Sequence, residues 1–137
     1  MQDADRWLTL VGRILLAWIF VMAGFGKLMS PGATIGYFGS IGLPVPVAAY
    51  AVALFVEILV GLALLVGYQT RVSALILAVW CILTAITAHS NFANRDMMIH
   101  FMKNFAMAGG LLFVAAHGAG AISLDAARLR RRGSAPA

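Results

Sequence analysis

The chain has 137 residues, of which 62% are hydrophobic and only 11% are charged. Soluble domains carry about 25% charged residues, so a water-soluble fold of this length would have too few charges to cover its surface. The composition argues against a disordered chain and a nucleic-acid-binding domain, and it favours an integral membrane protein. The net charge of +5 agrees with this, because four arginines gather in the tail, where they favour anionic lipid over a nucleic-acid partner: Arg128, Arg130, Arg131 and Arg132.

Four segments are long and apolar enough to cross a bilayer, which takes roughly 20 residues of helix. We expect spans at about residues 7–28, 47–67, 72–89 and 103–122, with a basic tail over 123–137. The sequence thus predicts a single all-α domain over residues 1–137, an integral membrane four-helix bundle. A signal peptide is the competing interpretation of the first apolar run, but no A-x-A cleavage site directly follows that run.

A short helix is expected between the first and second spans. Ser30-Pro31 is typical of a helix start, since the hydroxyl can cap the helix and proline suits the first turn. Ile35, Phe38 and Ile41 recur every third residue, which places them on one side of a helix lying at the membrane interface. Gly42 and Pro44 are expected to end it.

The positive charges predict the orientation. After the turn at residues 67–71, the third and fourth spans are expected to be joined by a loop over residues 90–102. Four crossings place both termini on one side, and that side carries seven Lys and Arg residues against three on the other. We therefore predict a multi-pass protein of the cell inner membrane with both termini in the cytoplasm.

Glu57 lies at the midpoint of the second span, where a carboxylate costs about 2.5 to 3.5 kcal/mol unless it is neutral, paired or wet. Arg13 and Lys27 on the first span are the candidate partners. Helical side chains lean toward their own N-terminus, so Lys27 leans toward Glu57, whereas Arg13 leans away and is expected to extend to the cytoplasmic head groups. The direction of the side chains favours Lys27.

The distance between these two residues is the weaker part of the prediction. Their Cα atoms are expected to differ in depth by roughly 12 to 14 Å, and neighbouring helix axes add about 8 to 10 Å. We therefore predict a polar cavity that opens outward around Glu57 and Lys27, in preference to a direct salt bridge. The alternative to a functional role is that Glu57 is a structural residue, either protonated or hydrogen-bonded to a backbone carbonyl.

The outer rim of the bundle is expected to carry further polar side chains that could contact a ligand: His89, His100, Lys103 and Asn104. The two histidines are eleven residues apart without an HxxxH or ExxH companion, so we expect no metal there and interpret them as titratable interfacial groups. Trp18 and Trp80 lie deeper and are expected to pack against lipid or the core. A lone Cys81 excludes an internal disulfide, and its role stays open.

Four stretches in order along the chain carry a family resemblance: GRILLAWIFVMAGFGKL, GLP, EILVGLALLVGYQTR and FMKNFAMAGGLLFVAAHGAGAISLD. The pattern resembles the DoxX family of small four-helix membrane proteins. The resemblance implies a bundle in a bacterial or archaeal cytoplasmic membrane. Members include a subunit of an archaeal thiosulfate:quinone oxidoreductase, and others are associated with membrane redox-defence complexes.

The resemblance also implies that certain residues occupy the recurring polar positions of the family: Arg13, Lys27, Glu57, Arg71 and Asn104. Among these, Arg13 and Arg71 are expected to be structural. The chain lacks a cysteine pair and any evident electron-carrier motif, so independent thiosulfate or disulfide turnover is not expected. Function varies across the family, and the name alone assigns no reaction.

The leading hypothesis is a membrane subunit of a redox system that binds a quinone head group or a similar small molecule. Glu57 would donate a proton, Lys27 would polarise a carbonyl, and a rim histidine would relay protons. Electrons would come from a soluble redox enzyme, because no intrinsic cofactor is predicted. The alternatives are a bundle that binds or transports a solute or lipid, for which a homodimer would be needed, and a non-catalytic membrane anchor for a partner enzyme.

Overall fold

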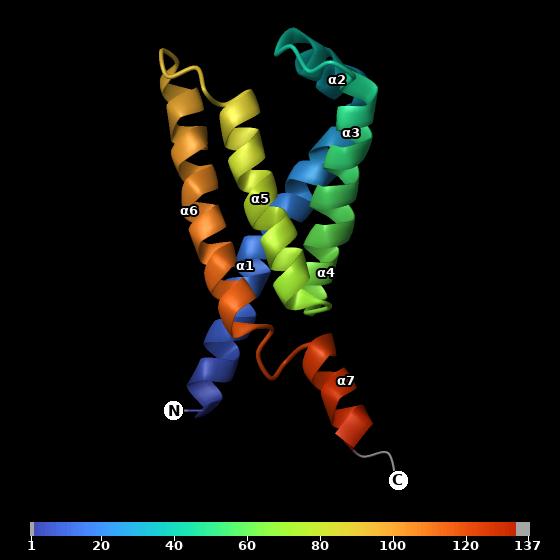
Figure 1. Cartoon of the computed structure of the whole chain (residues 1–137), viewed down its shortest axis with the longest axis vertical. Helices are drawn as coiled ribbons and strands as arrows, with labels where there is room; N and C mark the ends of the chain where they lie inside the picture. The colour runs from blue at the N-terminus through green and yellow to red at the C-terminus, as the bar shows by residue number, and fades with distance from the viewer. Residues whose placement is uncertain (1, 134–137) are drawn as a thin grey trace.

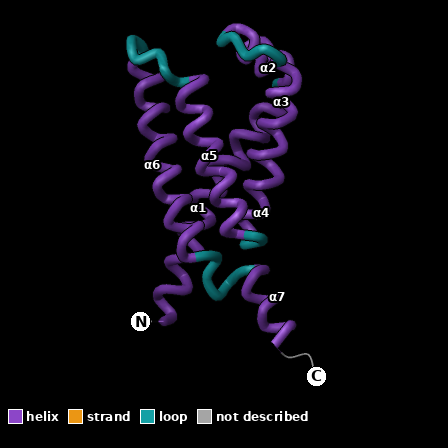
Figure 2. Tube along the Cα trace, in the orientation of Figure 1, coloured by secondary structure: helices purple, strands orange, loops and turns teal. Residues whose placement is uncertain are grey.

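The structure is a computed structural model that describes residues 2–133, and every element in that range is a helix (Figures 1 and 2). The helices are α1 (Gln2–Met29), α2 (Pro31–Ser40), α3 (Pro46–Leu54), the π-helix η1 (Phe55–Val60), α4 (Gly61–Val66), α5 (Thr70–Ala88), α6 (Arg95–His117) and α7 (Leu124–Gly133). This confirms the all-α prediction. Residues 134–137 of the predicted basic tail lie outside the described residues.

Four stretches are long and apolar enough to cross a membrane: Asp3–Met29, Pro46–Val66, Thr70–Ala88 and Arg95–His117. They confirm the four predicted spans. The start of α1 and the whole of α7 lie at the same end of the bundle, as an even number of crossings requires (Figure 1). The side of the membrane that this end faces stays a prediction.

The fourth span begins earlier than the sequence suggested. The predicted loop over residues 90–102 is wrong from Arg95 onward, because α6 starts there and ends at His117. Asn94 explains the early start, since its side chain accepts hydrogen bonds from the backbone N–H groups of Asp96 and Met97 at 2.9 and 3.4 Å. At the other end, Gly118 has a φ of +84°, a left-handed conformation that stops the helix.

The tail and the second span also contain elements that the sequence analysis did not predict. The first part of the basic tail forms the helix α7, for which the sequence analysis made no prediction. In the second span, α3 and α4 are joined without a break by η1, a wide turn of π-helix that contains Glu57. Such turns are rare and occur mostly as local bulges within α-helices, frequently at functional sites.

The core lies where the four spans meet, and its fully buried members include Ala17, Leu64, Leu77, Cys81 and Leu111. Two glycines allow α1 to pack closely against the second span. A Cβ on Gly61 would stand 3.2 Å from Val21, and one on Gly24 would stand 3.3 Å from the backbone nitrogen of Ile58. Large apolar side chains such as Trp18, 59% exposed, cover the outside, as expected for a surface in contact with lipid.

The end of the bundle opposite the termini is more open. There α5 and α6 run side by side and diverge from α2 and α3 (Figure 1). The short helix α2 confirms the helix predicted between the first two spans. It is linked to the end of α5 by a hydrogen bond from the hydroxyl of Tyr37 to the carbonyl of Ala88 at 3.0 Å. This link closes one side of the space in which the candidate site lies.

Candidate functional site

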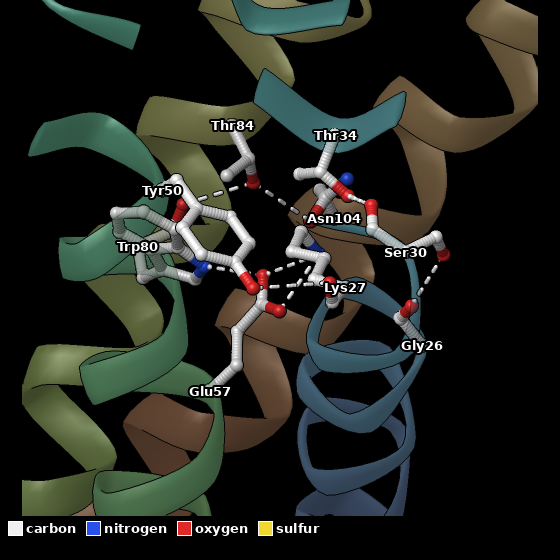
Figure 3. A network of polar contacts seen from close by, with 9 residues as sticks. All are labelled: Gly26, Lys27, Ser30, Thr34, Tyr50, Glu57, Trp80, Thr84 and Asn104. Carbon is white, nitrogen blue, oxygen red and sulfur yellow. Dashed lines mark hydrogen bonds and ion pairs between the residues drawn. The ribbon is translucent and has the colours of Figure 1, made fainter. Parts of the chain in front are cut away.

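Lys27 and Glu57 form a direct ion pair within the membrane-spanning part of the chain (Figure 3). The ammonium of Lys27 donates to Oε1 of Glu57 at 2.9 Å and to Oε2 at 2.7 Å. The glutamate side chain is 6% exposed and the lysine side chain is 25% exposed. The structure thus confirms Lys27 over Arg13 as the partner, and the expectation that direct contact would be marginal is wrong.

The close approach of α1 to η1 explains why the expected gap was too large. Gly24 lies one turn before Lys27, and a Cβ built on it would stand 3.1 Å from the Cβ of Glu57. The estimate from sequence assumed an ordinary interaxial spacing and a regular helix around Glu57. Neither holds, because a glycine faces a π-turn at this point.

Trp80 on α5 is the third member of this cluster. Its indole N–H donates to Oε1 of Glu57 at 3.2 Å, so both carboxylate oxygens are hydrogen-bonded. We expected Trp80 only to pack against lipid or the core, and that prediction missed its contact with Glu57. The available signal was chemical, since an indole N–H within an apolar span usually finds an acceptor.

Tyr50 supports the lysine from the side of α3. Its hydroxyl donates to the backbone carbonyl of Lys27 at 3.3 Å. This carbonyl belongs to the last turn of α1, where it also accepts a hydrogen bond from the backbone N–H of Ser30 at 3.2 Å. The tyrosine therefore ties the end of α1 to α3 beside the ion pair, a role that the sequence did not reveal.

A cavity of about 780 Å³ lies beside the ion pair, between α1, α2, α3, α5 and α6. All six residues predicted to contact a ligand line it: Lys27, Glu57, His89, His100, Lys103 and Asn104. Most of the remaining wall is apolar, with Phe20, Phe38 and Met107 among its members. The arrangement combines a buried ion pair, an apolar wall and a polar rim.

Asn104 lies in the wall on α6 and is held from two directions. Its Nδ2 donates to the carbonyl of His100 at 2.9 Å, while its Oδ1 accepts a hydrogen bond from the hydroxyl of Thr84 at 3.3 Å. Thr84, on α5, was not predicted and also lines the cavity. These bonds link α5 and α6 and hold a carboxamide at the wall of the cavity (Figure 3).

The rim carries positive and titratable groups. The rings of His89 and His100 stack with their centroids 5.1 Å apart. Burial lowers the pKa of His89, and repulsion from His100, Lys103 and Lys27 lowers it further. These effects favour the neutral form of His89, which offers one N–H donor and one acceptor nitrogen at the mouth of the cavity.

Arg13 and Arg71 lie at the other end of the bundle, away from the cavity. Arg13 is only 2% exposed, so the expectation that it extends to the head groups is wrong. It donates to the carbonyl of Ala119 and, at 2.9 Å, to that of Ile122, and so secures the loop before α7. Arg71 is exposed and lies near Gly118 in the same region.

Asp125 completes this second polar cluster. Its carboxylate accepts hydrogen bonds from the backbone N–H groups of Gln69 and Thr70, both at 2.8 Å, at the start of α5. Desolvation raises the pKa of Asp125, whereas these hydrogen bonds and the nearby Arg128 lower it. The net effect is a lowered pKa. The cluster fixes α7 against the bundle, and the structure gives it no contact with the cavity.

Comparison with known proteins gives a consistent result. The model of a family described as DoxX matches residues 8–90, which include Lys27, Glu57, Trp80 and His89. The chain is 40% identical over 116 residues to the inner membrane protein YqjF of Escherichia coli (strain K12), covering 85% of this chain and 88% of that protein. It is 35% identical over 123 residues to the inner membrane protein YphA of the same strain, covering 86% and 88%. No solved structure matches the chain.

Proposed function

The chain belongs to the DoxX family of integral membrane proteins, and from this premise we propose that it is a membrane subunit of a redox system whose cavity holds a quinone head group. One observation carries the proposal: the Lys27–Glu57 ion pair lines a cavity whose wall is otherwise largely apolar. The names of both relatives state only that they are inner membrane proteins, so they support the location and leave the ligand open.

An ion pair is an expensive feature to maintain inside a membrane span. Removing two charges from water costs several kcal/mol per ion, and a hydrophobic pair of similar volume is often as stable or more so. Ionisable groups at such positions mark ligand or proton pathways by default. The presence of the Lys27–Glu57 pair therefore supports a function at the cavity, beyond the link that the pair makes between α1 and η1.

A quinone fits the chemistry of the cavity walls. It is a flat apolar ring with a carbonyl acceptor at each end, and natural quinones carry an apolar tail. Lys27 has three N–H donors, of which Glu57 takes two, so the third can be offered to one carbonyl. His100 or Lys103 at the rim can donate to the other. The volume of about 780 Å³ lies within the range of small-molecule sites.

Reduction of a quinone to a quinol takes up two electrons and two protons. In the ion pair the ammonium of Lys27 carries the protons, so Lys27 can pass one to the nearer carbonyl oxygen while Glu57 holds it in place. A rim histidine can relay the second proton from water to the farther oxygen. The electrons come from a partner, which we take to be a soluble redox enzyme.

Titration of a short-tailed ubiquinone analogue into the full chain in lipid nanodiscs tests the proposal. Wild type is expected to bind it, and Glu57→Gln is expected to weaken binding by roughly tenfold or more, because the carboxamide no longer holds the lysine ammonium in place. Arg71→Gln is the matched control, because Arg71 lies at the other end of the bundle. This variant is expected to bind the analogue as wild type does.

Two outcomes would count against the proposal. Equal binding by wild type and Glu57→Gln, or binding by neither, would remove the quinone from this cavity. A phospholipid that co-purifies with the protein in native mass spectrometry, and that the quinone fails to displace, would favour a lipid-binding bundle in its place.

A further inference from the structure

Two histidines and a methionine meet at the rim of the cavity. Nδ1 of His89 lies 3.5 Å from Sδ of Met97, and the rings of His89 and His100 have their centroids 5.1 Å apart. His89 follows the end of α5, whereas Met97 and His100 belong to the first two turns of α6. Because residues three apart lie on the same face of a helix, Met97 and His100 both face the histidine across the connecting loop.

These separations match the spacing of ligands on a single small ion. Donors about 2.0 Å (nitrogen) and about 2.3 Å (sulfur) from one tetrahedral ion stand about 3.5 Å apart. Two imidazoles on such an ion have their ring centroids about 5 Å apart, because each centroid lies about 1 Å beyond the donor nitrogen. The distance from Nδ1 to Sδ agrees with the first value and the centroid distance with the second. The two ring planes are 27° apart and stacked, so binding one ion requires a rotation of the exposed His100 ring that turns its donor nitrogen toward the sulfur.

From this geometry we propose that His89, Met97 and His100 form a binding site for monovalent copper. A thioether is a soft donor that selects Cu(I), and imidazole also suits copper. Harder or divalent ions are disfavoured, since no group of three or more His, Cys, Asp or Glu residues within residues 2–133 could hold a metal. Lys27 and Lys103 add positive charge near His89, and a dication is repelled about twice as strongly as a monovalent ion.

The surrounding structure orders the ligands and leaves them accessible. The side chain of Asn94 caps α6 and accepts from the backbone N–H of Met97 itself, which fixes the turn that carries the sulfur. His100 is exposed, whereas His89 and Met97 are half-buried, so an ion can reach the site from water. Sequence alone does not predict this site, because the third donor is a methionine and the start of α6 was placed too late.

Competition for Cu(I) tests the proposal with the full chain in detergent, without oxygen and with ascorbate present. Wild type is expected to withdraw about one copper per chain from the colorimetric chelator bicinchoninate. Met97→Leu and His100→Gln are expected to weaken binding by roughly tenfold or more. Met98→Leu replaces the neighbouring methionine and His117→Gln a histidine at the opposite end of α6, and both are expected to bind as wild type does.

X-ray absorption of the copper-loaded protein provides a second measurement. Replacing Met97 would leave the absorption spectrum unchanged if this residue had only a structural role. Wild type is expected to show a copper–sulfur distance of about 2.3 Å, and Met97→Leu only nitrogen or oxygen neighbours. Unchanged copper affinity in Met97→Leu, an unchanged absorption spectrum, or equally tight Zn(II) binding would overturn the proposal. Leucine closely matches methionine in volume, and an unchanged melting temperature checks that the variant folds. Both measurements are made without added quinone, so their failure would leave the proposed function standing.

Discussion

Gly24 on α1 stands directly against Glu57 on η1, so that a Cβ on the glycine would lie 3.1 Å from the Cβ of the glutamate. The same atom would lie 2.5 Å from Cγ1 of Ile58. No ordinary side chain fits this space without movement of the second span. The absence of a side chain at Gly24 is thus a condition for the contact between Lys27 and Glu57.

Gly24→Ala is therefore expected to lower the free energy of unfolding by about 1 to 3 kcal/mol, because the added methyl group overpacks the contact with η1. Unfolding of the protein in mixed micelles with increasing SDS measures the change. Gly26→Ala is the matched control on the same helix, since a Cβ there meets nothing within 4 Å. That variant is expected to be neutral or more stable by up to about 1 kcal/mol, and equal losses in both variants would contradict the role of the close approach.

Lys27→Met leaves the carboxylate of Glu57 buried without its cation, and it is expected to destabilise the fold by about 3 kcal/mol. Adding Glu57→Leu to this variant removes the unpaired charge and is expected to recover most of the loss. A double-mutant cycle in the same SDS assay measures the coupling between the two residues. Additive effects of the single variants would show that the pair does not act as a unit.

Arg13→Gln is expected to release α7, because the buried guanidinium joins α1 to the carbonyls of Ala119 and Ile122. Trypsin reports the release directly, since α7 contains Arg128, Arg130, Arg131 and Arg132. Faster cleavage in this tail is expected for Arg13→Gln. Arg6→Gln, which removes only an exposed ion pair with Asp3, is expected to be cleaved at the wild-type rate. Identical rates for the two variants would contradict the assignment.

Asp125→Ala is expected to cost about 1 kcal/mol at pH 7, because the carboxylate caps the start of α5. The pKa of Asp125 is lowered in the folded protein, so its contribution is present above the unfolded value of about 3.9 and is lost as the pH falls through the folded pKa. Stability measured from pH 7 downward should thus show wild type and variant converging in acid. A difference that stays constant over this range would exclude the charge as its source.

Much of the fold follows from hydropathy. A bilayer requires long apolar helices, so the four spans and the short helix before the second span could be located from composition and spacing. The start of α6 was missed because Arg95 and Asp96 lower the local hydropathy, although Asn94 carried the signal of a helix cap. Hydropathy gives the apolar centre of a span more reliably than its polar ends.

The candidate site was predictable in part. The direction in which helical side chains lean identified Lys27 as the partner of Glu57, and the positions of the span ends brought the rim residues together. Direct contact was missed because it depends on Gly24 and on the π-turn, neither of which leaves a periodic trace in the sequence. The burial of Arg13 was missed because its acceptors are backbone carbonyls in a loop more than a hundred residues away.

The wide turn of η1 sets the rotational phase of everything that follows it in the second span. A regular helix advances about 100° per residue, and a π-turn accommodates one residue more than an α-helical turn does. Deleting a single residue from η1 would convert it to ordinary helix and rotate α4 relative to α3 by about that angle. Leu64 would then leave the core. The second span thus consists of two half-helices with separate registers. One half contributes residues to the cavity, and the other packs in the base of the bundle.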